Sequence, residues 1–369
     1  MKTVEREAMG AWDNGATSLA ARFVCRSGRV LVAVLAACAV ASVTHGRAIA
    51  ADAPPLRAGI IGLDTSHAVA FTGLLHKDAP APGLSGVRVV AAYPQGSRDI
   101  ESSVQRVPEY TEKMRGFGVE IVDSIPALLE RVDVVLLESN DGRVHLEQAV
   151  PVLAAKKPLF IDKPMTASLA DAIAIFAIAR HHGTPVFSAS ALRYGPQTQA
   201  VRGGSLGRVL GCDTHSPYSL EPTHPDLFWY GIHGCESLFT VMGPGCESVS
   251  RTSGTDMEVV TGLWSGGRVG TFRGLAAGKK GYGGTAFGAD GIGPVGEFGG
   301  YDPLVVAIVS FFKSRQPPVE ERETLEILAF MEAADESRRR DGGRVSLAEV
   351  FAKAEPVARE RAAAHLGAK

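Results

Sequence analysis

The sequence predicts an α/β fold: an N-terminal Rossmann-like doubly wound parallel sheet, followed by an α+β domain with a mostly antiparallel sheet. Between residues 56 and 190, short apolar runs alternate with amphipathic stretches, which is typical of strand–helix units in a parallel sheet. After residue 205, short β-like runs are separated by Gly and Pro turns, which favours antiparallel pairing.

The first half contains the clearest secondary-structure signals. The run VDVVLL at 132–137 is apolar apart from one residue, as expected for a strand covered on both faces. At 168–182, Ser168 can cap a helix, Asp171 lies in its first turn, and Gly183 can end it. Further strands are expected at 58–63, 87–93, 158–161 and 186–191, and further helices at 124–131 and 144–155.

In the second half of the chain, the sequence predicts several strands first and helices after them. We expect strands at 248–252, 257–264 and 268–272, and a segment rich in loops where glycines cluster between 262 and 300. Two helices at 305–314 and 320–339 and a surface helix at 347–366 follow. The domain boundaries are therefore expected at 56–190 and 191–346, with a helical tail at 347–369.

The first 50 residues predict a secretory signal peptide. Three arginines precede the apolar run at 30–43, which is shorter than the roughly 20 residues that a spanning helix needs. We expect cleavage after Ala50, and hence an exported, periplasmic protein with no stable membrane span in its mature form. A lipoprotein anchored at Cys38 is a second interpretation.

Composition narrows the range of partners. The formal net charge of −2 over 369 residues gives no general attraction to nucleic acid, so no such partner is expected. Beyond the leader only Cys212, Cys235 and Cys246 remain, without CxxC spacing, so neither a zinc knot nor a disulfide framework is predicted. One bridge among these three cysteines stays open as an alternative.

The candidate catalytic residue is Lys163. The short apolar run at 158–161 leads directly into Asp162, Lys163 and Pro164. Ligands bind at strand ends in open α/β sheets, and a lysine that loses hydration there can act as an acid, a base or an electrostatic clamp. Pro164 restricts the residue before it, so the ammonium group is held in one direction.

Other motifs follow in a specific order. Arg193-Tyr194 opens the second half, Gly231-Ile232-His233 lies within it, and Pro317-Pro318-Val319 precedes the long helix. With Asp162-Lys163-Pro164 and an upstream His145, their order and spacing resemble the Gfo/Idh/MocA oxidoreductases over nearly the whole chain after the leader. Members of that family are NAD(P)-dependent enzymes that act mostly on sugars and polyols, and their signature has Glu where this chain has Asp162.

The resemblance implies roles for particular residues. Lys163 would lie beside the nicotinamide and the reacting hydroxyl, and His233 would be a second acid–base or substrate-orienting group. A buried core histidine is the alternative for His233, and His145 is expected to be structural or on the cofactor side. The resemblance also implies substrate contacts from Arg193, Tyr194 and Tyr230, and cofactor contacts from Gly62, Thr65, Ser66, His67, Ser97, Arg98, Asp162 and Pro164.

The phosphate-binding turn departs from the usual pattern. Dinucleotide-binding sheets carry Gly-x-Gly-x-x-Gly after the first strand, and here only Gly62 fits. Asp64 and His67 replace the second and third glycines, and a carboxylate repels a pyrophosphate at close range. Either Asp64 points away and Thr65 and Ser66 hold the phosphate, or ordinary cofactor binding is lost.

A second departure concerns the adenosine ribose. No acid follows the second strand at 93–98, where Ser97 and Arg98 would suit a 2′-phosphate, so NADP is slightly favoured over NAD. His233 and Glu236 have a spacing that can ligate metal, but a lone pair is usually a structural hydrogen bond, so no metal is predicted.

Two functional hypotheses follow. The first is an exported oxidoreductase that transfers a hydride between a nicotinamide cofactor and a hydroxyl or carbonyl of a sugar or polyol, with a homo-oligomer expected because relatives commonly pair through the open face of the second sheet. The second is a degenerate, cofactor-free relative that binds carbohydrate, or a lyase or hydrolase whose NAD is not consumed.

Overall fold

The structure, a computed structural model, describes residues 54–367 of the chain, which belong to one compact unit. The leader expected at 1–50, with its cleavage site and Cys38, lies outside the described residues. Within the described part, no helix is both long and apolar enough to cross a membrane.

The first sheet is parallel throughout and has the strand order β3-β2-β1-β4-β5-β6. The order reverses between β1 and β4, and this switch point opens a crevice at the carboxyl ends of the strands. The predicted doubly wound sheet is confirmed. Its strands are β1 (Leu56–Ile61), β2 (Val87–Tyr93), β3 (Glu120–Ile121), β4 (Val134–Leu137), β5 (Leu159–Ile161) and β6 (Val186–Ser188).

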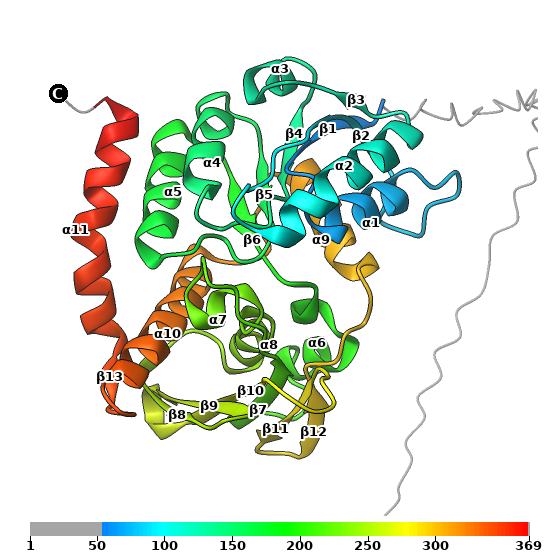
Figure 1. The fold of residues 1–369 in the computed structure, drawn as a ribbon. Helices are drawn as coiled ribbons and strands as arrows, with labels where there is room; N and C mark the ends of the chain where they lie inside the picture. The colour runs from blue at the N-terminus through cyan, green and yellow to red at the C-terminus, as the bar shows by residue number, and fades with distance from the viewer. Residues whose placement is uncertain (1–53, 368–369) are drawn as a thin grey trace, which may run out of the picture. The chain divides into compact units, whose positions relative to one another are not determined.

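Helices cover both faces of this sheet (Figure 1). They are α1 (Ser66–Leu75), α2 (Glu101–Gly116), α3 (Ile125–Leu129), α4 (His145–Ala154) and α5 (Leu169–His182). The expected boundaries of α5 are confirmed: the Ser168 hydroxyl accepts from the Asp171 N–H, and Gly183 ends the helix with a φ of 65°. Sequence analysis missed α1 and α2, which shape the crevice.

The second sheet has the order β12-β11-β7-β10-β9-β8-β13 and is antiparallel except between β7 and β10. Its strands are β7 (Val209–Pro217), β8 (Cys246–Ser253), β9 (Met257–Trp264), β10 (Val269–Leu275), β11 (Gly283–Gly288), β12 (Ile292–Val295) and β13 (Val345–Ser346). The mostly antiparallel sheet is confirmed, but the glycine-rich stretch holds β11 and β12 besides the expected β10, where a segment rich in loops was expected. Glycine is needed there because a Cβ at Gly284 would lie 2.2 Å from the Asp213 carbonyl oxygen of β7.

The remaining helices pack on both halves of the fold. Short helices lead into the second sheet: η1 (Ala191–Tyr194), α6 (Pro196–Arg202), α7 (Asp226–Trp229) and α8 (Ile232–Met242). Then come the short turn η2 (Ser265–Gly267) and three long helices, α9 (Asp302–Ser314), α10 (Glu321–Arg339) and α11 (Leu347–Leu366). α8 packs on β7 and β10, and α10 packs on β8.

Two late helices return to the first sheet. The buried side chains of α9 share a core with β1, β2 and β6, and Phe311 packs edge-on against Phe187 at 4.8 Å between ring centroids. The C-terminal α11 runs beside α5 (Figure 1). The chain therefore crosses between the two halves several times, which holds the crevice walls in one arrangement.

The three cysteines of the described residues are free and buried. None of them forms the bridge left open from the sequence.

Candidate active site

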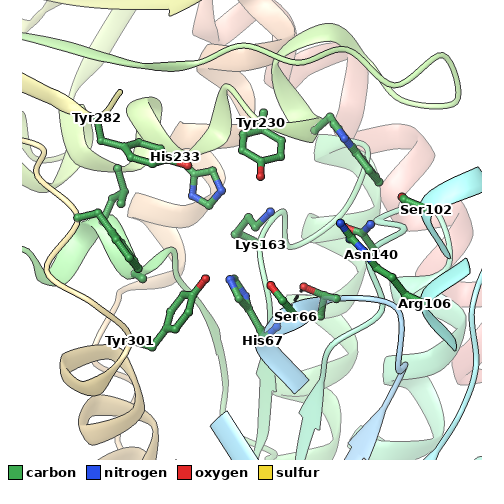
Figure 2. A pocket seen from close by; sticks show the side chains of 15 residues that line it. Ser66, His67, Ser102, Arg106, Asn140, Lys163, Tyr230, His233, Tyr282 and Tyr301 are labelled. Atoms are coloured by element: carbon green, nitrogen blue, oxygen red, sulfur yellow. Dashed lines mark hydrogen bonds between the residues drawn. The ribbon is translucent and has the colours of Figure 1, made fainter. Parts of the chain in front are cut away.

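A pocket of about 300 Å³ lies between the strand ends of the first sheet and the segment around α7 and α8. Figure 2 shows Lys163 near its centre, with His67 and Ser66 on one side and Tyr230 and His233 on the other. The lining residues are Thr65, Ser66, His67, Ser102, Arg106, Asn140, Lys163, Ala191, Leu192, Trp229, Tyr230, His233, Tyr282, Phe298 and Tyr301. None of these is acidic.

Lys163 follows β5 directly and projects into the pocket (Figure 2). The Lys163–Pro164 peptide bond is cis. Its ammonium lies 5.4 Å from the centre of the Tyr230 ring, within the range of a cation–π contact. Burial lowers the pKa of Lys163, and the positive charge of Arg106 lowers it further against the opposing effect of Asp162.

His233 lies in the first turn of α8 and lines the pocket, as the functional interpretation requires. Its Nδ1 is 2.7 Å from the Ser190 hydroxyl, which leaves Nε2 for a ligand. Burial lowers the pKa of His233 well below its usual value, and the positive charge of Lys163 acts in the same direction. The ring is therefore neutral at neutral pH and suited to hydrogen bonding with a hydroxyl.

Aromatic side chains form the wall of the pocket away from the first sheet. Tyr230 and Tyr282 meet the His233 ring edge-on, at 5.4 Å and 5.9 Å between centroids. Trp229 and Phe298 continue this wall, whereas Tyr301 lies beside His67, with 4.8 Å between the ring centroids (Figure 2). Flat rings of this kind bind the apolar faces of a sugar or cyclitol ring, while hydroxyls and amines at the rim orient its polar groups.

The β1–α1 turn resolves the question raised by Asp64. The Asp64 carboxylate is fully buried and accepts hydrogen bonds from the Ser103 hydroxyl at 2.7 Å and the Asn140 N–H at 2.9 Å. Burial raises the pKa of Asp64, which these donors partly offset. Asp64 thus points away from the pocket, and Thr65 and Ser66 line it at the N-terminus of α1.

Arg106 places a positive charge beside the β1–α1 turn. The Arg106 guanidinium donates to the Asp64 carbonyl oxygen at 3.3 Å and lines the pocket beside Ser102 and Asn140. A helix N-terminus, two hydroxyls and a guanidinium suit a phosphate group, so the residues present fit a dinucleotide.

The packing of the protein itself requires a glycine at position 62. It has a φ of +93°, and a Cβ there would lie 2.4 Å from the Ser139 backbone nitrogen. The collision would be with the β4–α4 loop of the protein itself, so Gly62 allows close packing of two loops.

The end of β2 also differs from expectation. Ser97 donates its hydroxyl to Asp141 rather than pointing freely into the crevice. Asp141 is held by Arg143 as well, and Arg143 pairs with Asp99. Arg98 is exposed. The carboxylates near this strand end come from Asp99 and the distant Asp141, whose position only the fold reveals.

Asp162 and Pro164 lie beneath the pocket, not in its lining. Asp162 Oδ2 is 2.7 Å from His67 Nδ1, so the acid of the signature orients a pocket histidine. Pro164 packs close to Gly142 in the β4–α4 loop. His145 lies between the carbonyl oxygens of Ser139 and Met165, at 2.8 Å and 2.9 Å, which confirms a structural position for that residue.

Two expected substrate contacts lie away from the pocket. Arg193 is buried and forms ion pairs with Glu236 at 2.5 Å and Glu323 at 2.7 Å. Tyr194 is largely enclosed, and burial raises its pKa to about 12. The expected roles of Arg193 and Tyr194 are therefore wrong for this pocket, because a guanidinium taken from water needs carboxylate partners and finds them inside the second half.

Several pocket residues were missed from the sequence. Ser102 and Arg106 come from α2, and Tyr282, Phe298 and Tyr301 come from the glycine-rich segment and its end. Glu138 was missed as well, although it follows β4 as directly as Asp162 follows β5. An acid immediately after an apolar strand is a signal that the sequence offered at this position.

Comparison with known proteins identifies the first domain, which supplies part of the pocket. Residues 56–190 match the family model described as GFO_IDH_MocA, "Oxidoreductase family, NAD-binding Rossmann fold". The N-terminal domain of the chain therefore matches the NAD-binding domain of the Gfo/Idh/MocA oxidoreductases. The expected class, an oxidoreductase with an NAD-binding Rossmann domain, is thereby confirmed.

Individual relatives are distant. The chain is 27% identical over 111 residues to the uncharacterized oxidoreductase YhhX of Escherichia coli (strain K12), a match that spans 27% of this chain and 32% of that protein. A probable dehydrogenase from Thermotoga maritima has a similar fold, with a TM-score of 0.65 and 19% identity over 80% of this chain and 100% of that one. Myo-inositol dehydrogenase from Lactobacillus casei, solved with NAD(H) and myo-inositol, has a TM-score of 0.64 and 17% identity over 79% and 96%.

The orientation of Asp64 generates a testable prediction. Asp64→Gly should lower the free energy of unfolding by about 1–3 kcal/mol, because the Ser103 hydroxyl and the Asn140 N–H lose their acceptor. Dinucleotide affinity should not improve. Urea unfolding and calorimetric titration measure the two quantities, with exposed Asp78→Gly as the control. Tighter dinucleotide binding by Asp64→Gly would show that the carboxylate does obstruct the site.

The buried position of Arg193 generates a second testable prediction. Arg193→Met should cost about 3–5 kcal/mol of stability, because Glu236 would remain buried without its cation and Glu323 would keep only Arg202. The matched control is Arg180→Met, which removes an exposed pair with Glu321 and should cost about 0–1 kcal/mol. Equal, small losses for the two variants in urea unfolding would contradict the assignment of Arg193 to the core.

Proposed function

We propose that the chain transfers a hydride between a nicotinamide dinucleotide and a hydroxyl or carbonyl group of a sugar or polyol. The observation that carries this proposal is the Lys163 amine, held in a pocket between a phosphate-compatible turn and an aromatic wall. The relative from Lactobacillus casei, solved with NAD(H) and myo-inositol, supports the same pairing of cofactor and polyol.

Lys163, His233 and Tyr230 have different roles in the proposed reaction. A bound nicotinamide would supply or accept the hydride. Lys163, in its neutral form, takes the hydroxyl proton as the carbonyl develops, and burial makes that form more accessible than for an exposed lysine. His233 Nε2 holds a second polar group of the substrate, and Tyr230 positions both the amine and the sugar ring.

The proposed cofactor is NAD or NADP, with NADP slightly favoured. Arg98 is the exposed cation at the end of β2 and suits a 2′-phosphate, whereas the neighbouring Asp99 is already paired with Arg143. Calorimetric titration with both dinucleotides decides between them. Failure of both to bind would favour the cofactor-free, carbohydrate-binding alternative.

The role of Lys163 is tested directly by substitution. Lys163→Met should lower kcat/KM for polyol oxidation at least about 100-fold, because the proton acceptor is removed, while dinucleotide affinity and the unfolding midpoint change little. The assay follows NAD(P)H absorbance with myo-inositol and a panel of related polyols, and exposed Lys77→Met is the control. A Lys163→Met enzyme with full activity would remove the lysine from the mechanism.

We also propose that the protein is exported and acts in the periplasm, with small-molecule carbohydrate as its partner and self-association through the second sheet. Export rests on the arginine-flanked apolar run at 30–43 and the small residues up to Ala50. N-terminal sequencing of the protein recovered from a periplasmic fraction should begin at Ala51. An intact N-terminus on the purified protein would contradict this.

A further inference from the structure

Three ionisable side chains lie together just beneath the pocket floor. Glu138 follows β4, Asp162 follows β5, and His67 is the second residue of α1. Since β1, β4 and β5 are neighbours in the sheet, Glu138 comes from the strand between the other two elements. One potential ligand atom from each side chain lies within 4.8 Å of the others, and all three residues are buried.

Glu138 is the anomalous member of this group. It is fully buried, and neither of its carboxylate oxygens has a hydrogen-bond partner among the described residues. Asp162 Oδ1 also lacks a partner. A buried carboxylate without a hydrogen-bond donor is unfavourable, so these oxygens are open to a ligand that is not one of the described side chains.

The neighbouring groups do not satisfy Glu138 themselves. Lys163 is close enough to influence its charge but makes no hydrogen bond to either oxygen. A protonated carboxyl would also need an acceptor for its O–H, and neither Glu138 oxygen has a hydrogen-bond partner among the described residues. Both Glu138 oxygens are therefore available to a ligand.

We propose that His67, Glu138 and Asp162 bind a divalent first-row transition-metal ion. Imidazole nitrogen and carboxylate oxygen are ligands that Zn²⁺, Fe²⁺ and Mn²⁺ share, with bonds of about 2.0–2.2 Å for zinc. His67 Nδ1 and Asp162 Oδ2 form a 2.7 Å hydrogen bond in the structure, and a bound ion would replace that proton and move the two atoms slightly apart. A Glu138 oxygen, which has no hydrogen-bond partner, provides the third ligand.

The site differs from the pair considered in the sequence. His233 and Glu236 do not form a joint site, because Glu236 is bound to Arg193 and His233 to Ser190. The three residues of the new site come from separate elements, so their sequence spacing carries no metal signature. Of the three, only His67 lines the pocket, which places the ion immediately below the position of a ligand.

The test is metal binding by the untagged full chain, since a polyhistidine tag binds the same ions. After chelation and dialysis, titration with Mn²⁺ or Zn²⁺ should raise the thermal unfolding midpoint and saturate at one ion per chain. Elemental analysis of the reloaded protein gives the stoichiometry independently of turnover. No binding of either ion up to millimolar concentration would overturn the proposal.

Variants locate the ion. Glu138→Gln keeps the shape but loses the charge, and its affinity should fall at least about tenfold, while exposed Glu147→Gln on α4 should bind like the wild type. Equal affinity for Glu138→Gln and wild type would place the ion elsewhere and overturn the proposal. If Glu138→Gln does not fold, Co²⁺ absorption of the wild-type protein replaces it: d–d bands of imidazole–carboxylate coordination support the site, and a spectrum of hexaaqua cobalt overturns it.

Discussion

The removal of charged groups from water at the carboxyl ends of β1, β4 and β5 governs the chemistry of this protein. The parallel sheet ends there, so Glu138, Asp162 and Lys163 emerge where α1 and the second half close over them. In that setting burial, more than any single pair, decides protonation: it raises the pKa of Glu138 and lowers that of Lys163. Because burial lowers its pKa, Lys163 loses its proton more readily than a lysine on the surface.

The β1–α1 turn lacks two of the usual glycines. Asp64, which replaces one of them, forms hydrogen bonds within the protein. Asp64 uses its carboxylate to tie the β1–α1 turn to α2 and to the β4–α4 loop, through Ser103 and Asn140. Arg106 then supplies positive charge above the same turn. A sequence motif can therefore lose two glycines while the physical requirement, an anion-accepting helix N-terminus, is still met.

Local signals were predictable from sequence, and long-range pairings were not. The Ser168 cap and the Gly183 end of α5 depend on neighbouring residues, and Lys163 is marked by the strand before it and the proline after it. Arg193 meets Glu236 and Glu323 across 43 and 130 residues, which no local pattern encodes. The sequence predicted a helix at 305–314, but not that α9 packs on the first sheet. The helix α1 was not predicted from the sequence, because it is apolar on most sides and has no polar stripe.

The central claim is that the crevice holds a nicotinamide ring next to Lys163. A crystal structure of the full chain with NAD⁺ or NADP⁺ tests it most directly. The account expects the pyrophosphate at Thr65, Ser66 and Arg106, and the ring in contact with the Lys163 amine. A dinucleotide bound outside this crevice, or a Lys163 amine turned away from the ring, would contradict it.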